Sequence, residues 1–232
     1  MVATPRLVLF DIDGTLLTAA GAGRRAIHRA LRDVFGGVGP ADYWFDGKTD
    51  PQIVRDLMRH EGHSDAVIDE RLGEVLTRYA DRLGVELQDP SHSPIVHPGV
   101  PELLDSLESR NDVVLGLLTG NIEPGAAQKL RAVGLDPARF VIGAFGSDHE
   151  HRLELPTIAA TRARNHLGRD VELVVIGDTP ADVACGAGAQ RRAIAVATGR
   201  YTLAELTACG PAAAFEDLSD TEAVMAAILD GA

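Results

Sequence analysis

Short apolar runs that each lead into a small or polar residue constrain the fold of this chain most. Four such runs lie at 7–10, 113–118, 173–176 and 193–197, and they lead into Asp11, Thr119, Asp178 and Thr198. Apolar residues without alternation are typical of strands buried on both faces of a parallel sheet. Segments compatible with helices, such as 123–133 and 181–189, follow the runs. This alternation predicts an α/β fold with right-handed crossovers.

The residues from 18 to 95 follow a different pattern. Their apolar spacing predicts amphipathic helices over 22–35, 51–61 and 65–83, and Thr49 or Asp50 can cap the second helix and Ser64 the third. Prolines exclude a regular helix over 89–99. We therefore predict a Rossmann-like three-layer α/β/α core with a mostly parallel sheet (1–17 and 96–232) and an inserted helical cap (18–95). Residues 17–23 and 89–99 are the expected hinges between them.

Two carboxylates follow the first apolar run. Asp11 and Asp13 are two residues apart, so in a continuing strand they point to the same side, and Gly14 allows a sharp turn after them. Two carboxylates that face one pocket repel each other, and a hard cation such as Mg²⁺ relieves that repulsion. An ordinary surface turn is the alternative interpretation. A calcium loop would need a third acidic or amide residue before its glycine, which this stretch lacks.

Two further motifs make the pattern specific. The stretches "DIDGT" (11–15), "LLTGN" (117–121) and "GDTPAD" (177–182) occur in this order, each after an apolar run. Together they resemble the haloacid dehalogenase superfamily of aspartate-nucleophile phosphotransferases, and the resemblance extends over nearly the whole chain, including the helical cap. It implies a Mg²⁺-dependent phosphatase that acts through an aspartyl-phosphate on a small organic phosphate, such as phosphoglycolate.

The resemblance also implies a role for each motif residue. Asp11 is expected to be the nucleophile and Asp13 the general acid and base. Thr119 is expected to hold the phosphoryl group, and Mg²⁺ to be bound by Asp11, the backbone carbonyl of Asp13, Asp178 and Asp182. Further substrate contacts are expected from Thr15, Gly120 and Asn121.

A structural interpretation of the same polar residues stays open. Thr119 and Asn121 are also suited to cap the helix that begins near Glu123. Asp178 and Asp182 are suited to be the cap and first-turn acids of the next helix.

The positive charge that the superfamily places beside the nucleophile has no obvious counterpart. It is usually a lysine before the third acidic motif, but the chain has only Lys48 and Lys129, and neither stands there. Arg152 occupies the right region, and a guanidinium supplies a permanent charge and a two-pronged grip on oxygens. We therefore expect Arg152 to take this role, with Lys129 as the alternative, although we expect Lys129 on the surface.

The cap contains "YWFDGKTDPQ" (43–52), which resembles the cap stretch of phosphoglycolate phosphatase-like members. Lys48 is expected to reach the anionic substrate when the cap closes. Alternatively, Trp44 and Phe45 form the cap core and Lys48 is solvated. Arg24 and Arg25 either face the pocket or bulk water.

Asp13 favours a phosphatase among the activities of the superfamily, because a phosphomonoester leaves as an alkoxide that needs a proton. A sugar-phosphate mutase keeps the same acid and is the enzymatic alternative. A non-catalytic module that binds phosphate or Mg²⁺ is the alternative from another class.

Composition limits the partners and the location. The net charge of −12 argues against binding to nucleic acid or an anionic membrane. Two cysteines are too few for a disulfide framework, and the first apolar run is too short for a signal peptide or a membrane span. We therefore expect a cytoplasmic monomer or homodimer whose partner is a small phosphate ester.

Overall fold

A six-stranded parallel sheet forms the centre of the molecule in the computed structural model, which describes residues 4–229. The strand order is β5-β4-β1-β6-β7-β8, so β1 lies between the two strands that carry the other polar ends, with Val8 opposite Leu115 and Val174. The strands are β1 (Arg6–Phe10), β4 (Val113–Thr119), β5 (Ile142–Phe145), β6 (Glu172–Gly177), β7 (Arg191–Val196) and β8 (Ala213–Phe215). The four predicted strands are confirmed, and β5 and β8 are additional edge strands.

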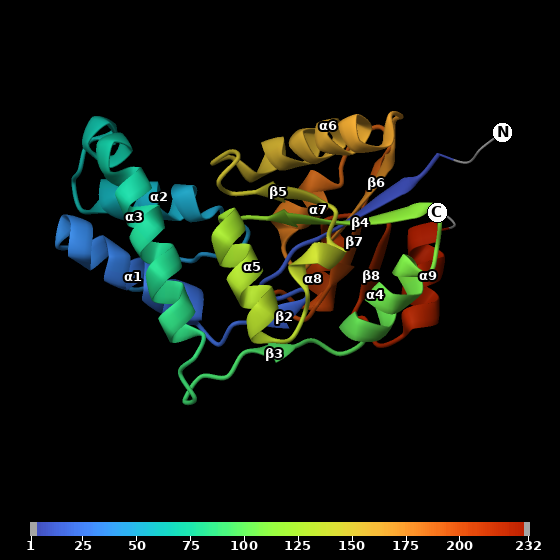
Figure 1. The fold of residues 1–232 in the computed structure, drawn as a ribbon, viewed down its shortest axis with the longest axis horizontal. Coiled ribbons are helices and arrows are strands. Elements are labelled where there is room, and N and C mark those ends of the chain that lie inside the picture. Colours follow the sequence, from blue (N-terminus) through green and yellow to red (C-terminus); the bar gives the residue numbers. More distant parts are fainter. Residues whose placement is uncertain (1–3, 230–232) are drawn as a thin grey trace.

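Helices cover both faces of this sheet, as predicted. Successive residues of β1 point to opposite faces, so Val8 and Phe10 pack into one hydrophobic core and Leu7 and Leu9 into another. Figure 1 shows α6 along one face and α4 and α9 along the other. The helices that pack on the sheet in the first core are α4 (Val100–Glu108), α5 (Glu123–Ala132) and α9 (Thr221–Leu229), and α6 (Leu155–Leu167), α7 (Pro180–Cys185) and α8 (Leu203–Ala208) lie on the opposite face.

Three helices form the insert, close to the predicted bounds: α1 (Ala22–Phe35), α2 (Asp50–His60) and α3 (Asp65–Glu86). They gather at one end of the molecule in Figure 1. Thr49 caps α2 by accepting a hydrogen bond from the Gln52 amide, whereas the Ser64 side chain makes no capping bond to α3. The chain enters and leaves the insert side by side, because β2 (Leu17–Thr18) pairs with β3 (Ile95–Val96). The division into two domains stays a prediction. Among residues 4–229, no helix has the length and apolar character needed to cross a bilayer.

The insert contacts the core through Thr49 and Asp50 at the start of α2. The Asp50 amide donates to the Gly120 carbonyl at 2.8 Å, and the Thr49 hydroxyl donates to the Glu150 carbonyl at 2.7 Å. Gly120 is required here, because a methyl group on it would overlap the backbone carbonyl of Lys48. The insert is therefore held against the loops that follow β4 and β5.

Candidate active site

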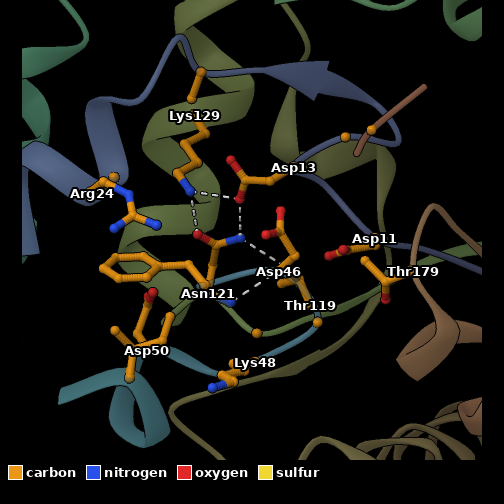
Figure 2. A pocket seen from close by; sticks show the side chains of 18 of the residues that line it. Asp11, Asp13, Arg24, Asp46, Lys48, Asp50, Thr119, Asn121, Lys129 and Thr179 are labelled. Atoms are coloured by element: carbon orange, nitrogen blue, oxygen red, sulfur yellow. Dashed lines mark hydrogen bonds and ion pairs between the residues drawn. The ribbon is translucent and has the colours of Figure 1, made fainter. Parts of the chain in front are cut away.

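A cavity of about 370 Å³ lies between the insert and the carboxyl ends of the central strands. Figure 2 shows side chains from both parts of the chain pointing into it. Its lining includes most of the predicted site residues: Asp11, Asp13, Lys48, Thr119, Gly120, Asn121, Arg152 and Asp178. Ligands of α/β proteins bind at this edge of the sheet, where neighbouring connections leave in opposite directions.

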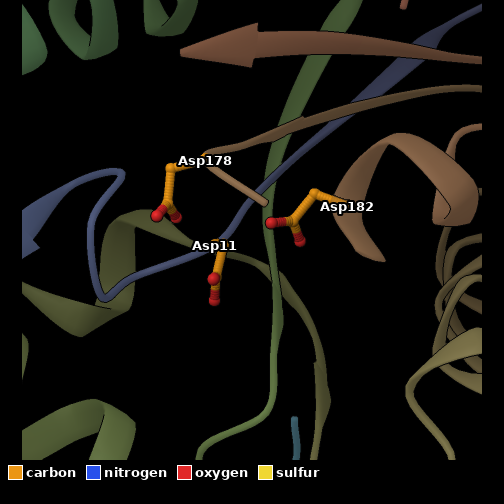
Figure 3. Close-up of side chains that lie close together, drawn as sticks. All are labelled: Asp11, Asp178 and Asp182. Carbon is orange, nitrogen blue, oxygen red and sulfur yellow. The ribbon is translucent and has the colours of Figure 1, made fainter. Parts of the chain in front are cut away.

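Three aspartates meet on the floor of the cavity, as Figure 3 shows. Asp11 follows β1, and Asp178 and Asp182 come from β6 and the start of α7. All three are buried, and one carboxylate oxygen of each lies within 4.8 Å of the others. Gly14 turns the chain over this cluster with φ +81°, and a methyl group on it would overlap the Asp178 carboxylate. The predicted convergence of the first and third motifs is thus present.

Burial and mutual repulsion disfavour the charged forms of these acids. Burial raises the pKa of Asp11 to about 6; the Arg152 charge opposes the shift, and the charges of Asp182 and Asp13 add to it. The pKa of Asp178 lies well above its ordinary value, first because of burial and then because of Asp182 and Asp11. Crowded carboxylate oxygens are the donors that Mg²⁺ prefers. The cluster therefore fits a metal ion, and a magnesium ion held by Asp11 and Asp178 stays a prediction.

Asp182 has its oxygens engaged by the protein. Oδ1 accepts from Arg152 at 2.5 Å, and Oδ2 accepts from the Thr179 hydroxyl at 2.6 Å and the Thr179 amide at 3.1 Å. Thr179 is the N-cap of α7 and forms a capping box with Asp182, so the interpretation of Asp182 as a first-turn acid is correct and that of Asp178 as the cap is wrong. Its role as a metal ligand stays a prediction.

Arg152 stands where the sequence placed the missing cation. It begins a short 3₁₀ helix, η2 (Arg152–Glu154), and is 6% exposed. Its Nη2 lies 3.0 Å from Oδ2 of Asp11 and 2.5 Å from Oδ1 of Asp182. The side chain therefore holds a permanent positive charge against the expected nucleophile. Its contact with substrate phosphate stays a prediction.

A second polar network lies to one side of Asp11, around Asp13 (Figure 2). Lys129 Nζ donates to Asp13 Oδ2 at 2.6 Å and to Asn121 Oδ1 at 2.6 Å. Asn121 Nδ2 donates to the same Asp13 oxygen at 2.8 Å and to the Thr119 hydroxyl at 2.8 Å. Thr119 and Asn121 thus face the site. Their interpretation as caps is wrong, since α5 is capped at Ile122 without either side chain.

The expectation of a surface position for Lys129 is also wrong, because this residue is 4% exposed. The buried positions of α5 are Gly125, Ala126, Lys129 and Leu130, which form one face of the helix. Lys129 lies on that face, and it replaces hydration of its ammonium by two charge-assisted hydrogen bonds. The spacing of these positions was the sequence pattern that could have predicted the burial of Lys129.

Asp50 is a site residue that the sequence suggested only as a helix cap. Its carboxylate accepts from the Ile122 amide at 2.8 Å, so it satisfies a free N–H at the start of α5. Burial raises the pKa of Asp50 to about 6, although the Lys129 charge and the Ile122 amide oppose the shift. No short sequence pattern predicts this contact, because Asp50 and Ile122 are 72 residues apart.

The insert supplies the outer wall of the cavity. Lys48 lines it, with Nζ 2.5 Å from the Tyr43 hydroxyl and 3.7 Å from Asp56. Phe45 packs against the hydrophobic core, whereas Trp44 is 55% exposed and stacks on Arg200 at 3.4 Å. The alternative of a cap core made by both aromatics is therefore correct for Phe45 and wrong for Trp44. The Lys48 contact with substrate stays a prediction.

Comparison with known proteins identifies the family. Residues 8–187 match the family model described as haloacid dehalogenase-like hydrolase, and residues 156–221 match a second, HAD-hydrolase-like model. The chain belongs to the haloacid dehalogenase-like hydrolase family.

Individual relatives agree with this assignment along nearly the whole chain. A phosphoglycolate phosphatase from Rhodospirillum rubrum is 28% identical over 228 residues, which cover 93% of this chain and 88% of the relative. A hydrolase from Pseudomonas syringae has the same fold, with TM-score 0.71 at 24% identity over 96% of this chain and 98% of that one. CbbY from Rhodobacter sphaeroides, solved in complex with phosphate, has TM-score 0.71 at 17% identity over 94% and 96% of the two chains.

Membership of the haloacid dehalogenase-like hydrolase family confirms the predicted superfamily, the fold class and the expectation of an enzyme. The three motifs that carried the resemblance lie within residues 8–187 and around one cavity. In this family member Arg152 touches the first aspartate, at the place where we expected it to supply the positive charge.

Proposed function

We propose that this hydrolase is a Mg²⁺-dependent phosphatase that cleaves phosphomonoesters through an aspartyl-phosphate on Asp11. The observation that carries the proposal is the arrangement around Asp11. Its carboxylate contacts Arg152 at 3.0 Å and lies in a cluster of three buried acids, and Asp13 stands two residues further on. This combination supplies a nucleophile, a fixed positive charge, a cation site and a proton donor.

The steps follow from these groups. A carboxylate oxygen of Asp11 attacks phosphorus, and the bond from phosphorus to the alcohol oxygen breaks as Asp13 transfers a proton to that oxygen. Water then attacks the phosphorus of the aspartyl-phosphate while Asp13 accepts its proton, and the bond between phosphorus and the Asp11 oxygen breaks, which releases phosphate and restores the Asp11 carboxylate. Thr119 and the amides of Gly120 and Asn121 are expected to hold the phosphoryl oxygens. When bound by Asp11 and Asp178, Mg²⁺ neutralises charge between the carboxylates and the phosphate.

The position of Arg24 supports the proposal that the substrate carries a second acidic group. It lines the cavity, and its guanidinium lies 4.0 Å from the centre of the Phe45 ring and donates to the Tyr43 carbonyl at 2.8 Å. Among residues 4–229, it has no carboxylate within ion-pairing distance, whereas Arg25 pairs with Glu86 at 2.6 Å. A fixed guanidinium that faces a ligand cavity suits a carboxylate or phosphate.

The substrate class proposed is therefore a small organic phosphate that carries another anionic group. The relative from Rhodospirillum rubrum is a phosphoglycolate phosphatase, and phosphoglycolate has both a phosphate and a carboxylate. The cavity of about 370 Å³ has room for a compact molecule of this kind. Four cationic residues, Arg24, Lys48, Lys129 and Arg152, line the cavity together with five aspartates, so positive groups for an anionic substrate are present in a chain of net charge −12.

Phosphate release from a panel of phosphate esters tests the activity. We expect turnover with Mg²⁺, loss of turnover in EDTA, and loss in Asp11→Asn. Conversion of a sugar phosphate to an isomer without phosphate release would favour the mutase instead. No Mg²⁺-dependent release from any ester would favour the binding module.

Arg24→Gln tests the substrate class. We expect the ratio of kcat/KM for phosphoglycolate to that for ethyl phosphate to fall at least tenfold, since only phosphoglycolate has a carboxylate for Arg24. Arg29→Gln is the matched control, because Arg29 is an exposed arginine of the same helix and pairs with Glu86. An unchanged ratio in Arg24→Gln would exclude this residue from substrate recognition.

A further inference from the structure

Lys129 lies outside the three motifs but contacts residues of two of them. Lys129 extends from α5 towards β1, and its ammonium ends between Asp13 and Asn121 (Figure 2). Among the residues that the structure describes, Asp13 is the acid within ion-pairing distance of Nζ. Gly23 of α1 leaves the space that this requires, since a methyl group there would lie 3.3 Å from Nζ. Lys129 therefore belongs to the polar network of the site.

The same contacts distinguish the two oxygens of Asp13. Lys129 and Asn121 both donate to Oδ2, at 2.6 and 2.8 Å. Asn121 is itself fixed, because its Oδ1 accepts from Lys129 and its Nδ2 also donates to Thr119. The Asp13 side chain is 44% exposed, so it is much less enclosed than that of Lys129, which is 5% exposed. The two donors are therefore what orients this carboxylate.

We propose that Lys129 is a positioning residue for the general acid: with Asn121 it holds Oδ2 of Asp13 and leaves Oδ1 to exchange the proton with the substrate. This inference rests on the proposed function. The proton on Oδ1 moves to the leaving alkoxide oxygen as its bond to phosphorus breaks, and water returns a proton to Oδ1 in the second step. Lys129 itself gains and loses no proton.

A positioning role for Lys129 and direct binding of substrate by Lys129 predict different changes in kcat and KM. A leaving group that is unstable as an anion, such as an alkoxide, depends on a correctly placed acid, whereas p-nitrophenolate leaves with little protonation. Loss of the positioning contact therefore lowers kcat mainly for alkyl esters. Loss of a substrate-binding cation would instead raise KM for both kinds of ester.

Lys129→Met tests the proposal, because methionine keeps the unbranched length and removes the charge. We expect kcat for an alkyl phosphomonoester to fall at least 30-fold, kcat for p-nitrophenyl phosphate to fall less than about fivefold, and Lys129→Arg to regain part of the loss. Arg131→Met is the matched control, since Arg131 is exposed on the same helix. Equal losses on both esters, or a change confined to KM, would overturn the positioning role.

A double-mutant cycle measures the coupling between Lys129 and Asp13 without an activity assay. The unfolding free energies of Lys129→Met, Asp13→Asn and the double variant should be non-additive, with the double variant less destabilised than the sum of the single ones. Additive effects would overturn the pairing. A wild-type protein that releases no phosphate from any ester would reject the proposed function, and the cycle would still decide whether Lys129 and Asp13 are coupled.

Discussion

Asp50→Asn offers the clearest test of the electrostatics of this site. Asp50 is the first residue of α2, is buried where the insert meets α5, and accepts a hydrogen bond from the Ile122 amide with its carboxylate. Asparagine keeps an acceptor oxygen for that amide and removes only the ionisable group. The variant therefore isolates the free energy of keeping one charge in a buried position.

The magnitude follows from the pKa of Asp50, which burial raises from 3.8 to about 6. Because the folded state has the higher pKa, the protonated form favours folding. This contribution is fully present below about pH 3.8 and is lost as the pH rises through about 6. The difference between the two pKa values corresponds to about 3 kcal/mol of unfolding free energy.

The assay is urea unfolding of the wild type and the variant between about pH 3.5 and pH 7.5, with a chelator present. The other buried acids titrate in both proteins, so their contributions largely cancel in the difference. We expect the unfolding free energy of Asp50→Asn, relative to wild type, to increase by about 3 kcal/mol across this range. Asp42→Asn is the matched control, because Asp42 is exposed in the segment before α2.

A difference that stays constant with pH would refute the reasoning. It would mean that Asp50 titrates alike in the folded and unfolded states, so that burial does not penalise its charge. A difference that falls with rising pH would mean that the attraction of Lys129 outweighs burial.

Three further predictions concern other parts of the site. Arg152→Ala leaves two buried carboxylates without their cation. We therefore expect at least a 100-fold loss of kcat, and an unfolding free energy lower by about 3–5 kcal/mol in urea titrations. Near-normal turnover of the variant would remove Arg152 from the mechanism. Gly120→Ala should raise KM or lower kcat at least tenfold without loss of the folded core by circular dichroism, because the added methyl group overlaps the backbone of the insert. Thiol labelling at about pH 8 should modify Cys209 at least tenfold faster than Cys185, because burial raises the pKa of Cys185 to about 12 while Cys209 is exposed; equal rates would contradict the burial of Cys185.

Much of the fold was predictable because it depends on local patterns. The apolar runs at β1, β4, β6 and β7 are long enough to be recognised, and the period of the insert predicts three helices. The edge strands β5 and β8 have four and three residues, which is too short for a distinct signal, and their position depends on pairing with a neighbouring strand.

The floor of the site was also accessible from sequence. Parallel strands place their carboxyl ends at one edge of the sheet, so polar residues after three neighbouring strands must lie close together. Asp11, Thr119 and Asp178 follow that rule, and Arg152 follows from the need for a cation near them. The chemical roles of these residues remain part of the proposed function.

The sequence by itself therefore determined the parallel α/β core, the helical insert and the three strand ends that carry acids and a hydroxyl, since these follow from periodicity and from the geometry of one sheet. The tertiary structure decided which arginine and lysine side chains point into the cavity. Arg24 faces it while Arg25 pairs with Glu86, and Lys129 reaches Asp13 across 116 positions of sequence. These choices depend on how helices rotate and pack against partners far away in the chain, and no local pattern contains that information.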